Sequence, residues 1–474
     1  MKIFNSQSSL KEEFKSIEKG KINMYVCGMT IYDFCHIGHA RTFFSFDVMV
    51  NFFKYLNYEV NYVRNITDID DKIIQKAKEE EVPFSLITDK FIKAMNDDFK
   101  ALNIQPPSIE PKVSEHIEDI LEMIENLESN NFAYSGENSD VYFDIEKFPD
   151  YGKLSNRVQE DLDSGSRVEI DKNKKNPNDF VLWKKTSEEP TWDSKWGRGR
   201  PGWHIECSAM SLKHLGEKFD IHGGGSDLVF PHHEAEIFQS ECCLGHDPVV
   251  QYWLHNGMIN IDGEKMSKSI GNFWTVSDAL EKIEPLVLRY ALINAPYRQP
   301  VDFNSVMIDD SISHHGRLLS SYSEALYYSE GIRNDYSGIE HLVEATRRIR
   351  SGMDDDFNTR IALVEVQSVV KSLTSLIDSG EKGHHLMSAH VQWLEEFAGE
   401  VLGILPTPSV AISLHEDKIS RRSEISAKVE SLLEMRESAR ASKNWSESDR
   451  IRDELTEIGV VVEDGPEGTK WRLS

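Results

Sequence analysis

The sequence predicts an α/β fold in which a doubly wound parallel sheet is split by an insertion and is followed by an all-α helical bundle and a small C-terminal α/β domain. Two observations predict this architecture. Residues 22–27 are apolar and β-branched, helical spacing follows from Ala40 to Leu56, and 59–63 reads as a second strand. This strand–helix–strand order is typical of a parallel sheet. From Val276 onward the apolar spacing is helical.

A short motif, His36-Ile37-Gly38-His39, lies where the first predicted strand turns into its helix. Free backbone N–H groups and the helix dipole attract phosphate at such a turn, and Gly38 permits close approach. His36 and His39 can donate ring N–H groups to phosphate oxygens whose charge grows in a transition state. The alternative is a helix that begins with two solvated histidines by chance.

A second motif, Lys265-Met266-Ser267-Lys268-Ser269, lies in a polar loop punctuated by glycines. Such a loop can close over a triphosphate and place an ammonium on the α- or β-phosphate. Taken alone, a lysine pair of this kind is more often a solvated surface loop. In this order, the two motifs predict one site where ATP, with Mg²⁺, activates a carboxylic acid as an adenylate.

Four side chains between the motifs form a candidate metal site. Cys27 ends the first strand, Cys207 leads into a helix that should stop at Gly216, and His232 and Glu236 are four apart after Pro231. Two thiolates, an imidazole and a carboxylate suit tetrahedral zinc. The spacing is long-range, so buried structural cysteines and a helix-capping His232 are the alternatives.

Several longer motifs carry a family resemblance. They are CGMT at 27–30, NITDIDDK at 65–72, GRPGWHIECS at 199–208, FPHHE at 230–234 and EDGPEGTKW at 463–471. With the two ATP motifs, they resemble cysteinyl-tRNA synthetases, a branch of the class I aminoacyl-tRNA synthetases, over essentially the whole chain. The resemblance implies a Rossmann-like catalytic domain, a C-terminal anticodon-binding domain, and the substrates ATP, L-cysteine and tRNA(Cys).

The resemblance also implies roles for individual residues. Phosphate charge would be stabilised by His36, His39, Lys265 and Lys268. ATP would further contact Gly38, Gly224 and Asp227, which follow a predicted strand at 219–222. Gly28, Thr30, Thr67 and Trp203 would surround the amino acid, and Cys27, Cys207, His232 and Glu236 would hold one zinc ion. From the residues alone, 223–227 is also compatible with a tight turn and a capping Asp, and Trp203 with a core residue.

Zinc would answer a selection problem implied by the resemblance. Serine differs from cysteine by one atom, and an apolar pocket rejects near-isosteres by about 10²-fold or less. A zinc ion with an available position binds a thiolate in preference to a hydroxyl, because sulfur is the softer ligand. The metal would then recognise the substrate, and Glu236 would be the ligand that lengthens when the substrate sulfur arrives.

Composition sets outer limits. A chain of 474 residues should form several domains. No apolar run reaches the ~20 residues that span a bilayer, and residues 1–21 lack a signal-peptide core, so we expect a cytoplasmic protein with no membrane partner. Five scattered cysteines do not suggest a disulfide framework. We also expect a monomer.

The charge is uneven along the chain. Of the net −27, residues 421–474 carry only −2, from ten basic and twelve acidic side chains. On a helix predicted after Arg421, Arg436, Arg440 and Lys443 align at i, i+4 and i+7, and Trp445 follows. We expect these four to contact the anticodon loop through phosphate and stacking contacts. A solvated amphipathic helix is the alternative.

The remaining elements follow from periodicity and turn signals. Strands are expected at 140–144 and 180–183, helices at 305–331, 338–353, 359–379 and 384–404, a linker at Pro406–Pro408, an N-cap at Ser446, and a hairpin of 460–462 with 470–473. The expected divisions are 1–115 (first half of the catalytic domain), 116–186 (connective insertion), 187–250 (second half), 251–303 (second ATP motif and stem-contact region), 304–405 (helical bundle) and 406–474 (C-terminal domain).

Two other functions are compatible with parts of the pattern. A sister ligase that joins activated cysteine to an amino sugar shares the ATP and zinc motifs but lacks the C-terminal anticodon-reading part. A non-catalytic tRNA-binding paralogue typically loses the ATP motifs. Both ATP motifs and the C-terminal motif are intact here, which favours the synthetase.

Overall fold

The computed structural model describes most of the chain as two compact units. The described residues are 1–148, 150–156, 172–268, 270–379, 384–465 and 468–473. Unit 1 comprises 1–315, 337–369 and 394–405, and unit 2 comprises 316–336, 370–393 and 406–474. Ser269 of the second ATP motif and residues 466–467 of the C-terminal motif lie outside the described residues.

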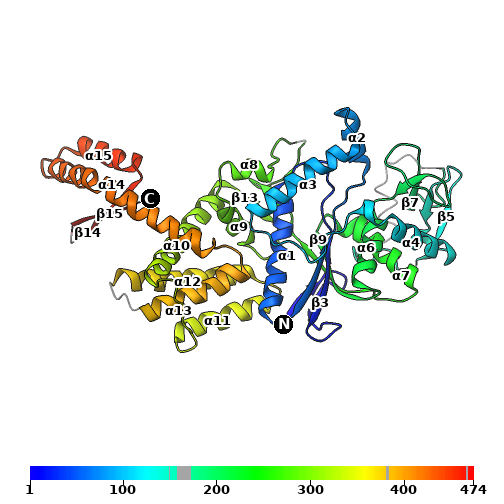
Figure 1. The fold of residues 1–474 in the computed structure, drawn as a ribbon, viewed down its shortest axis with the longest axis horizontal. Coiled ribbons are helices and arrows are strands. Elements are labelled where there is room, and N and C mark those ends of the chain that lie inside the picture. The colour runs from blue at the N-terminus through cyan, green and yellow to red at the C-terminus, as the bar shows by residue number, and fades with distance from the viewer. Residues whose placement is uncertain (149, 157–171, 269, 380–383, 466–467, 474) are drawn as a thin grey trace. The chain divides into compact units, whose positions relative to one another are not determined.

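Unit 1 is built on a four-stranded parallel sheet with the order β10-β9-β3-β4. Its strands are β3 (Lys21–Val26), β4 (Glu59–Arg64), β9 (Phe219–Gly225) and β10 (Val250–Asn256). From β3 the chain passes to β4 on one side and later to β9 on the other. The carboxyl ends of β3 and β9 therefore form the crevice of a doubly wound sheet, the usual ligand position in such folds. The predicted parallel sheet is confirmed (Figure 1).

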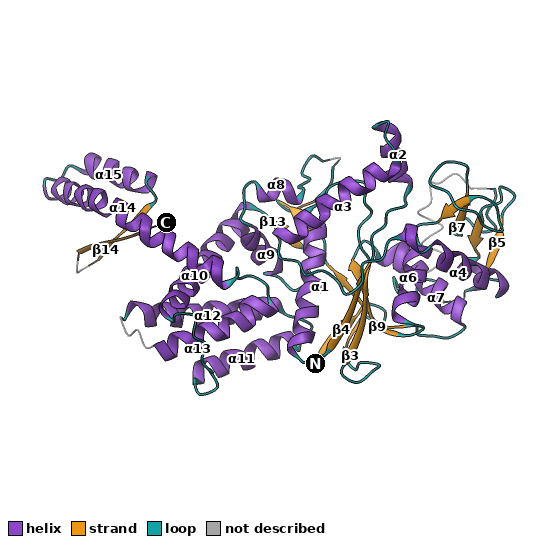
Figure 2. Ribbon diagram, viewed as in Figure 1, coloured by secondary structure: helices purple, strands orange, loops and turns teal. Residues whose placement is uncertain are grey.

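Helices cover both faces of this sheet (Figure 2). On one face lies α1 (Ile37–Tyr55), and on the other lie α6 (Ile205–Leu215) and α7 (Glu234–Leu244). Apolar side chains surround α1 on most sides, as in a fully buried helix. The α6 helix stops at Gly216, whose φ of +83° favours glycine, as the sequence predicts.

The predicted insertion, 116–186, contributes α4 and three strands of an antiparallel sheet, β5-β6-β7-β8, whose fourth strand, β8, follows the insertion in the chain. The strands predicted at 140–144 and 180–183 are confirmed as β6 and β7. The elements between β4 and β9 are α2 (Asp71–Glu79), α3 (Phe84–Ala101), a 3₁₀ turn (Val113–Glu115), α4 (Ile117–Ser129), β5 (Ala133–Ser135), β6 (Val141–Phe143), a 3₁₀ turn (Ile145–Lys147), β7 (Phe180–Lys185) and β8 (Gly199–Pro201), then α6.

Further elements complete the catalytic region and the helical part. They are β1 (Lys2–Asn5), β2 (Leu10–Glu13), a π-helical turn (Val229–His233), β11 (Ile259–Ile261), β12 (Glu264–Lys265), α8 (Val276–Leu280), α9 (Pro285–Ile293), β13 (Val301–Phe303), α10 (Ser305–Tyr328), α11 (Glu340–Met353), α12 (Thr359–Asp378), α13 (His384–Leu394) and a π-helical segment (Glu395–Val401). The four helices predicted between 305 and 404 are confirmed within a few residues.

The C-terminal part of unit 2 consists of α14 (Pro408–Ala441), α15 (Trp445–Glu457), β14 (Val460–Gly465) and β15 (Gly468–Leu473). Its core is Val429, Leu432, Ile451, Leu455 and Val460. The predicted hairpin is confirmed.

Three sequence expectations are wrong in this part. Residue 408 is not linker but the first residue of one 34-residue helix, because proline is favoured at a first helical position. Asn444, not Ser446, caps α15: its side chain accepts the Glu447 N–H at 3.3 Å. Lys443 has a φ of +59° beyond the end of α14, so it does not continue the helical row of Arg436 and Arg440.

None of the helices in the described part of the chain combines the length and the apolar character of a membrane-spanning segment.

Candidate active site

Both ATP motifs line one cavity of about 290 Å³ in unit 1, at the carboxyl ends of the central strands. The motif residues in its wall are His36, Gly38, His39, Met266, Ser267 and Lys268. Segments more than two hundred positions apart in the sequence therefore meet at a single site, as expected of two halves of one nucleotide pocket.

His36 and His39 form a reciprocal cap at the start of α1. The His39 N–H donates to His36 Nδ1 at 3.2 Å, and the His36 N–H donates to His39 Nδ1 at 3.3 Å. The two rings stack with centroids 3.6 Å apart. Because each Nδ1 accepts a hydrogen bond, each neutral ring carries its proton on Nε2, which is free to donate to a ligand.

Both rings are neutral near pH 7. Burial, with the nearby Lys268 ammonium, lowers the pKa of His36 to about 4. Burial, with the adjacent His36, lowers the pKa of His39 well below its usual value. The sequence predicts two ring donors here, and the geometry supplies two neutral N–H donors whose orientation is fixed by the cap.

Of the other residues predicted to contact ATP, some line the cavity and others do not. Asp227 lines the cavity, and so does Gly225, whereas Gly224 faces the His233 ring. A Cβ on Gly224 would lie 2.9 Å from that ring, so the glycine is needed for packing between β9 and His233. Lys265 is exposed on β12, opposite Asn260, and is not among the residues of the cavity wall.

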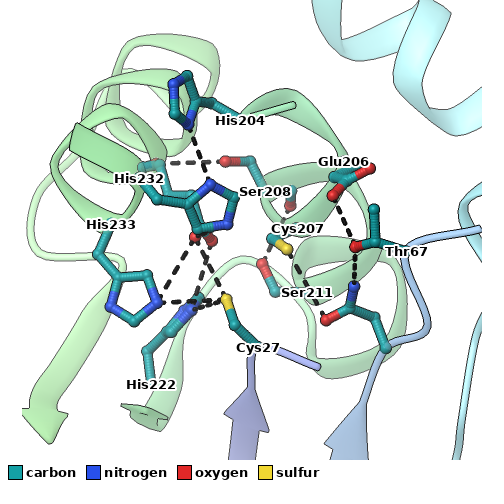
Figure 3. Close-up of polar contacts among 12 residues, drawn as sticks. Cys27, Thr67, His204, Glu206, Cys207, Ser208, Ser211, His222, His232 and His233 are labelled. Carbon is teal, nitrogen blue, oxygen red and sulfur yellow. Dashed lines mark hydrogen bonds and ion pairs between the residues drawn. The ribbon is translucent and has the colours of Figure 1, made fainter. Parts of the chain in front are cut away.

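Cys27, Cys207, His232 and Glu236, the predicted metal ligands, form a buried cluster in unit 1. Figure 3 labels the first three of them. One donor atom from each of the four lies within 4.8 Å of the others. The Cys27 thiol donates to Glu236 Oε1 at 3.5 Å, and His232 Nε2 lies 3.2 Å from the same oxygen. Their elements explain the meeting: Cys27 follows β3, Cys207 is on α6, and His232 and Glu236 flank the start of α7.

A second set of donors shares two of these residues. Cys27, His222, His233 and Glu236 also lie within 4.8 Å of one another. His233 Nε2 is 3.2 Å from Cys27 Sγ, and His222 Nε2 is 3.4 Å from it. No role is predicted from the sequence for His222 or His233. No spacing rule identifies them, because they reach the cluster from β9 and from the π-helical turn.

The donor chemistry fits a bound cation. Burial raises the pKa of Cys27 well above its usual value and that of Cys207 to about 12, and it lowers the pKa of His232. Among the described residues, buried Glu236 Oε2 accepts no well-aligned hydrogen bond, although His222 Nε2 lies 3.3 Å from it. A buried carboxylate without a full set of hydrogen bonds is costly, and a soft divalent cation would satisfy it together with two thiolates.

The residues expected to surround the amino acid are divided between this cluster and the cavity lined by the two motifs. Thr30 lines the cavity, three residues after Cys27. Thr67 is buried, and its hydroxyl donates to Glu206 Oε1 at 2.8 Å. The half-exposed Trp203 ring lies 4.5 Å from the His232 ring. A Cβ on Gly28 would meet the Asn65 carbonyl oxygen at 1.6 Å, so Gly28 is required by backbone packing.

Asn65 is a residue of this site that sequence reasoning gave no role. Its Oδ1 accepts the Gly28 N–H at 2.8 Å and lies 3.8 Å from Cys207 Sγ, and its Nδ2 donates to the Thr67 hydroxyl at 3.1 Å. One amide therefore ties β3, β4 and α6 together. Its place at the end of a predicted apolar strand was the available signal, since a buried amide there needs partners.

The predicted tRNA-contact residues are not equivalent. The Arg436 guanidinium is bound by both oxygens of Asp464, at 2.9 and 2.8 Å, and its side chain is largely buried. Arg440 donates to the same carboxylate at 2.7 Å. Lys443 is exposed in the turn between α14 and α15, and Trp445 is exposed at the first position of α15. The arginines thus have partners within the domain, while the other two face solvent.

Comparison with known proteins agrees with this geometry. Residues 13–313 match the family model of the class I (C) tRNA synthetase catalytic domain. A cysteine–tRNA ligase of Halorhodospira halophila is 48% identical, over 100% of this chain and 99% of that protein. The chain belongs to the cysteinyl-tRNA synthetase family. Another member, from Tolumonas auensis, is 44% identical over 100% of this chain and 99% of its own length.

The remaining family matches cover the helical and C-terminal parts. Residues 348–406 match a DALR domain, and 422–472 match the anticodon-binding domain of cysteinyl-tRNA ligases. A methionyl-tRNA synthetase of Mycobacterium tuberculosis superposes with a TM-score of 0.61, covering 83% of this chain and 93% of that one, at 13% identity. That likeness shows a shared class I fold.

Proposed function

We propose that the protein is a cysteine–tRNA ligase that activates L-cysteine with ATP and transfers it to the 3′ end of tRNA(Cys). The observation that carries this proposal is the buried thiol, imidazole and carboxylate cluster, joined by residues 27–30 to a cavity lined by both ATP motifs. Family membership supports the same reaction.

In the first step, the cysteine carboxylate attacks the α-phosphate of MgATP, and pyrophosphate leaves. The Nε2–H groups of His36 and His39 donate to phosphate oxygens as their negative charge grows, and the Lys268 ammonium, with Lys265, balances that charge. Gly38 lets the backbone come close to the nucleotide, Gly224 makes room for the His233 ring at the carboxyl end of β9, and Asp227 accepts from the ribose hydroxyls. Orientation and electrostatics carry the rate, with no covalent enzyme nucleophile.

Cys27, Cys207, His232 and Glu236 would hold one zinc ion. When bound, zinc supplies a soft Lewis acid that takes a thiolate in preference to a hydroxyl. Asn65 holds Cys207 and the Gly28 backbone in place, while Gly28, Thr30, Thr67 and Trp203 enclose the remainder of the amino acid. Specificity against serine then comes from the metal.

In the second step, a ribose hydroxyl of the terminal tRNA adenosine takes the acyl group. We assign 1–115 and 187–250 to the catalytic domain, 116–186 to an insertion that faces the acceptor end, 251–303 to the stem-contact region, 304–405 to the helical bundle and 406–474 to anticodon binding. Lys443 and Trp445 are the exposed candidates for the anticodon contact. Arg436 and Arg440, which are paired with Asp464, remain the other two candidates. The enzyme would act as a cytoplasmic monomer.

The amino-sugar ligase is the second candidate, and the match of 422–472 to an anticodon-binding domain weighs against it. The test is ATP–pyrophosphate exchange with cysteine, with serine, and with a Cys207→Ser variant. We expect exchange with cysteine alone. Absence of exchange with cysteine would contradict the enzymatic proposal, and equal exchange with serine would contradict the role of zinc.

A further inference from the structure

Asp33 places a carboxylate in the wall of the ATP cavity, where phosphate should bind. It lies three residues before His36, in the segment that joins β3 to α1. A negative charge beside a triphosphate opposes binding unless a cation accompanies it. No role is predicted from the sequence for this partly buried aspartate.

The partner of Asp33 is the lysine of the second ATP motif. Asp33 Oδ2 forms an ion pair with Lys268 Nζ, across 235 positions of sequence. The same ammonium lies 5.0 Å from the centre of the Phe273 ring and 5.6 Å from that of Tyr32. A carboxylate and two ring faces thus hold it over the cavity.

A second cation, the Lys76 ammonium, is close enough to pair with Asp33 when Lys268 leaves. Lys76 Nζ, on α2, lies 3.9 Å from Asp33 Oδ1. Asp33 Oδ1 also accepts the Phe34 N–H at 2.8 Å. Burial alone would raise the pKa of Asp33, but the hydrogen bond from Lys268 and the two nearby ammonium groups lower it, so the carboxylate is ionised at neutral pH.

We propose that the Asp33 carboxylate is an internal competitor of ATP: it occupies the Lys268 ammonium beside the cavity until a phosphate of ATP replaces it. Lys76 then stays with Asp33 and neutralises it. Lys268 is half exposed, with 52% of its side chain accessible, and ion pairs of that exposure are weak. A phosphate dianion, which makes stronger charge-assisted bonds, can displace the carboxylate.

The first test needs no ATP. Wild type and Asp33→Asn are treated with a limiting amine-reactive reagent, and modification of individual lysines is measured by mass spectrometry. We expect Lys268 to react at least threefold faster in D33N, because losing the ion pair frees its amine. Lys265, exposed on β12 in the same motif, is the internal control and should not change. An unchanged ratio of Lys268 to Lys265 modification would overturn the proposal.

The second test rests on the proposed function and uses cysteine-dependent pyrophosphate exchange. D33N should lower the KM for ATP about two- to fivefold, with kcat and the KM for cysteine unchanged. Lys76→Met should raise the KM for ATP, and this effect should vanish in the D33N background. A lower kcat, or an equal Lys76→Met effect in both backgrounds, would refute the role of Asp33. Absence of exchange in wild type would instead refute the proposed function. The lysine-labelling experiment would then be the test of the role of Asp33.

Discussion

Cys27 and Glu236 stand 209 positions apart in the sequence, and the Cys27 thiol lies 3.5 Å from Glu236 Oε1 in a fully buried site. The contact exists because β3 and β9 are neighbours in the parallel sheet and α7 follows β9 after the π-helical turn Val229–His233. Residues from both sides of the insertion therefore share one cluster at the carboxyl edge of the sheet.

Cys207→Ser should lower the zinc content of the purified protein from one ion per chain to well under one. A hydroxyl is a poor ligand for zinc at neutral pH, whereas a thiolate binds strongly. Zinc is measured by mass spectrometry of the digested protein. Cys243→Ser is the matched control, since Cys243 is partly buried and outside the cluster.

The second donor set, Cys27, His222, His233 and Glu236, offers an alternative set of zinc ligands. If His222 and His233 are the ligands, His233→Gln will lose zinc and Cys207→Ser will keep it. We expect the reverse order of losses. Wild-type protein without zinc would contradict both sets.

Replacement of His36 should separate capping from catalysis. Asn is also a good N-cap, so His36→Asn keeps the α1 cap and removes the ring donor, whereas His36→Ala removes both. We expect both variants to lose about 10²-fold in the rate of pyrophosphate exchange. Only the alanine variant should lose a further ~1 kcal/mol of folding stability. An asparagine variant with wild-type exchange would show that the ring donates nothing to the reaction.

Stability should decline as the pH falls below about 6.5. Burial, with the nearby Lys268 charge, lowers the pKa of His36 to about 4, below the ~6.5 of an unfolded histidine. Between these values the unfolded chain binds the proton and the folded chain does not. The stabilisation is complete above pH 6.5 and is lost toward pH 4, by up to ~1.4 kcal/mol per pH unit for one histidine.

Thermal unfolding of wild type and His36→Asn, measured from pH 7.5 to 5, checks this dependence. The variant should show a shallower decline, because one neutral buried imidazole has been removed. Parallel declines in the two proteins would assign the effect to other groups.

The exposed and the paired residues of the C-terminal domain should behave differently. Trp445→Ala with Lys443→Ala should weaken tRNA charging at least several-fold and leave pyrophosphate exchange unchanged, because stacking and phosphate contacts are lost. Arg436→Met should instead destabilise the domain by about 1–2 kcal/mol, since it removes the bidentate partner of Asp464. Charging that is unaffected by the double replacement would refute the proposed contact.

Sequence patterns predicted what depends on local periodicity and strong motifs. The β3–α1–β4 unit, the stop of α6 at Gly216 and the terminal hairpin are of this kind, and all are observed. Patterns did not locate the start of α14, because proline signals both a linker and a first helical turn. They also missed Asn65, His222 and Asp33, whose partners come from distant strands and loops. A single polar side chain has no sequence periodicity, so its position along the chain does not reveal such contacts.

Charging of tRNA(Cys) with labelled cysteine is the measurement that tests the central claim most directly. The purified chain is incubated with MgATP, a tRNA(Cys) transcript and either cysteine or serine, and acylation of the 3′ end is measured. We predict cysteinyl-tRNA with cysteine, and acylation with serine at least 10²-fold slower, beyond what an apolar pocket achieves. No acylated tRNA with cysteine, from protein that carries zinc and binds ATP, would contradict the account.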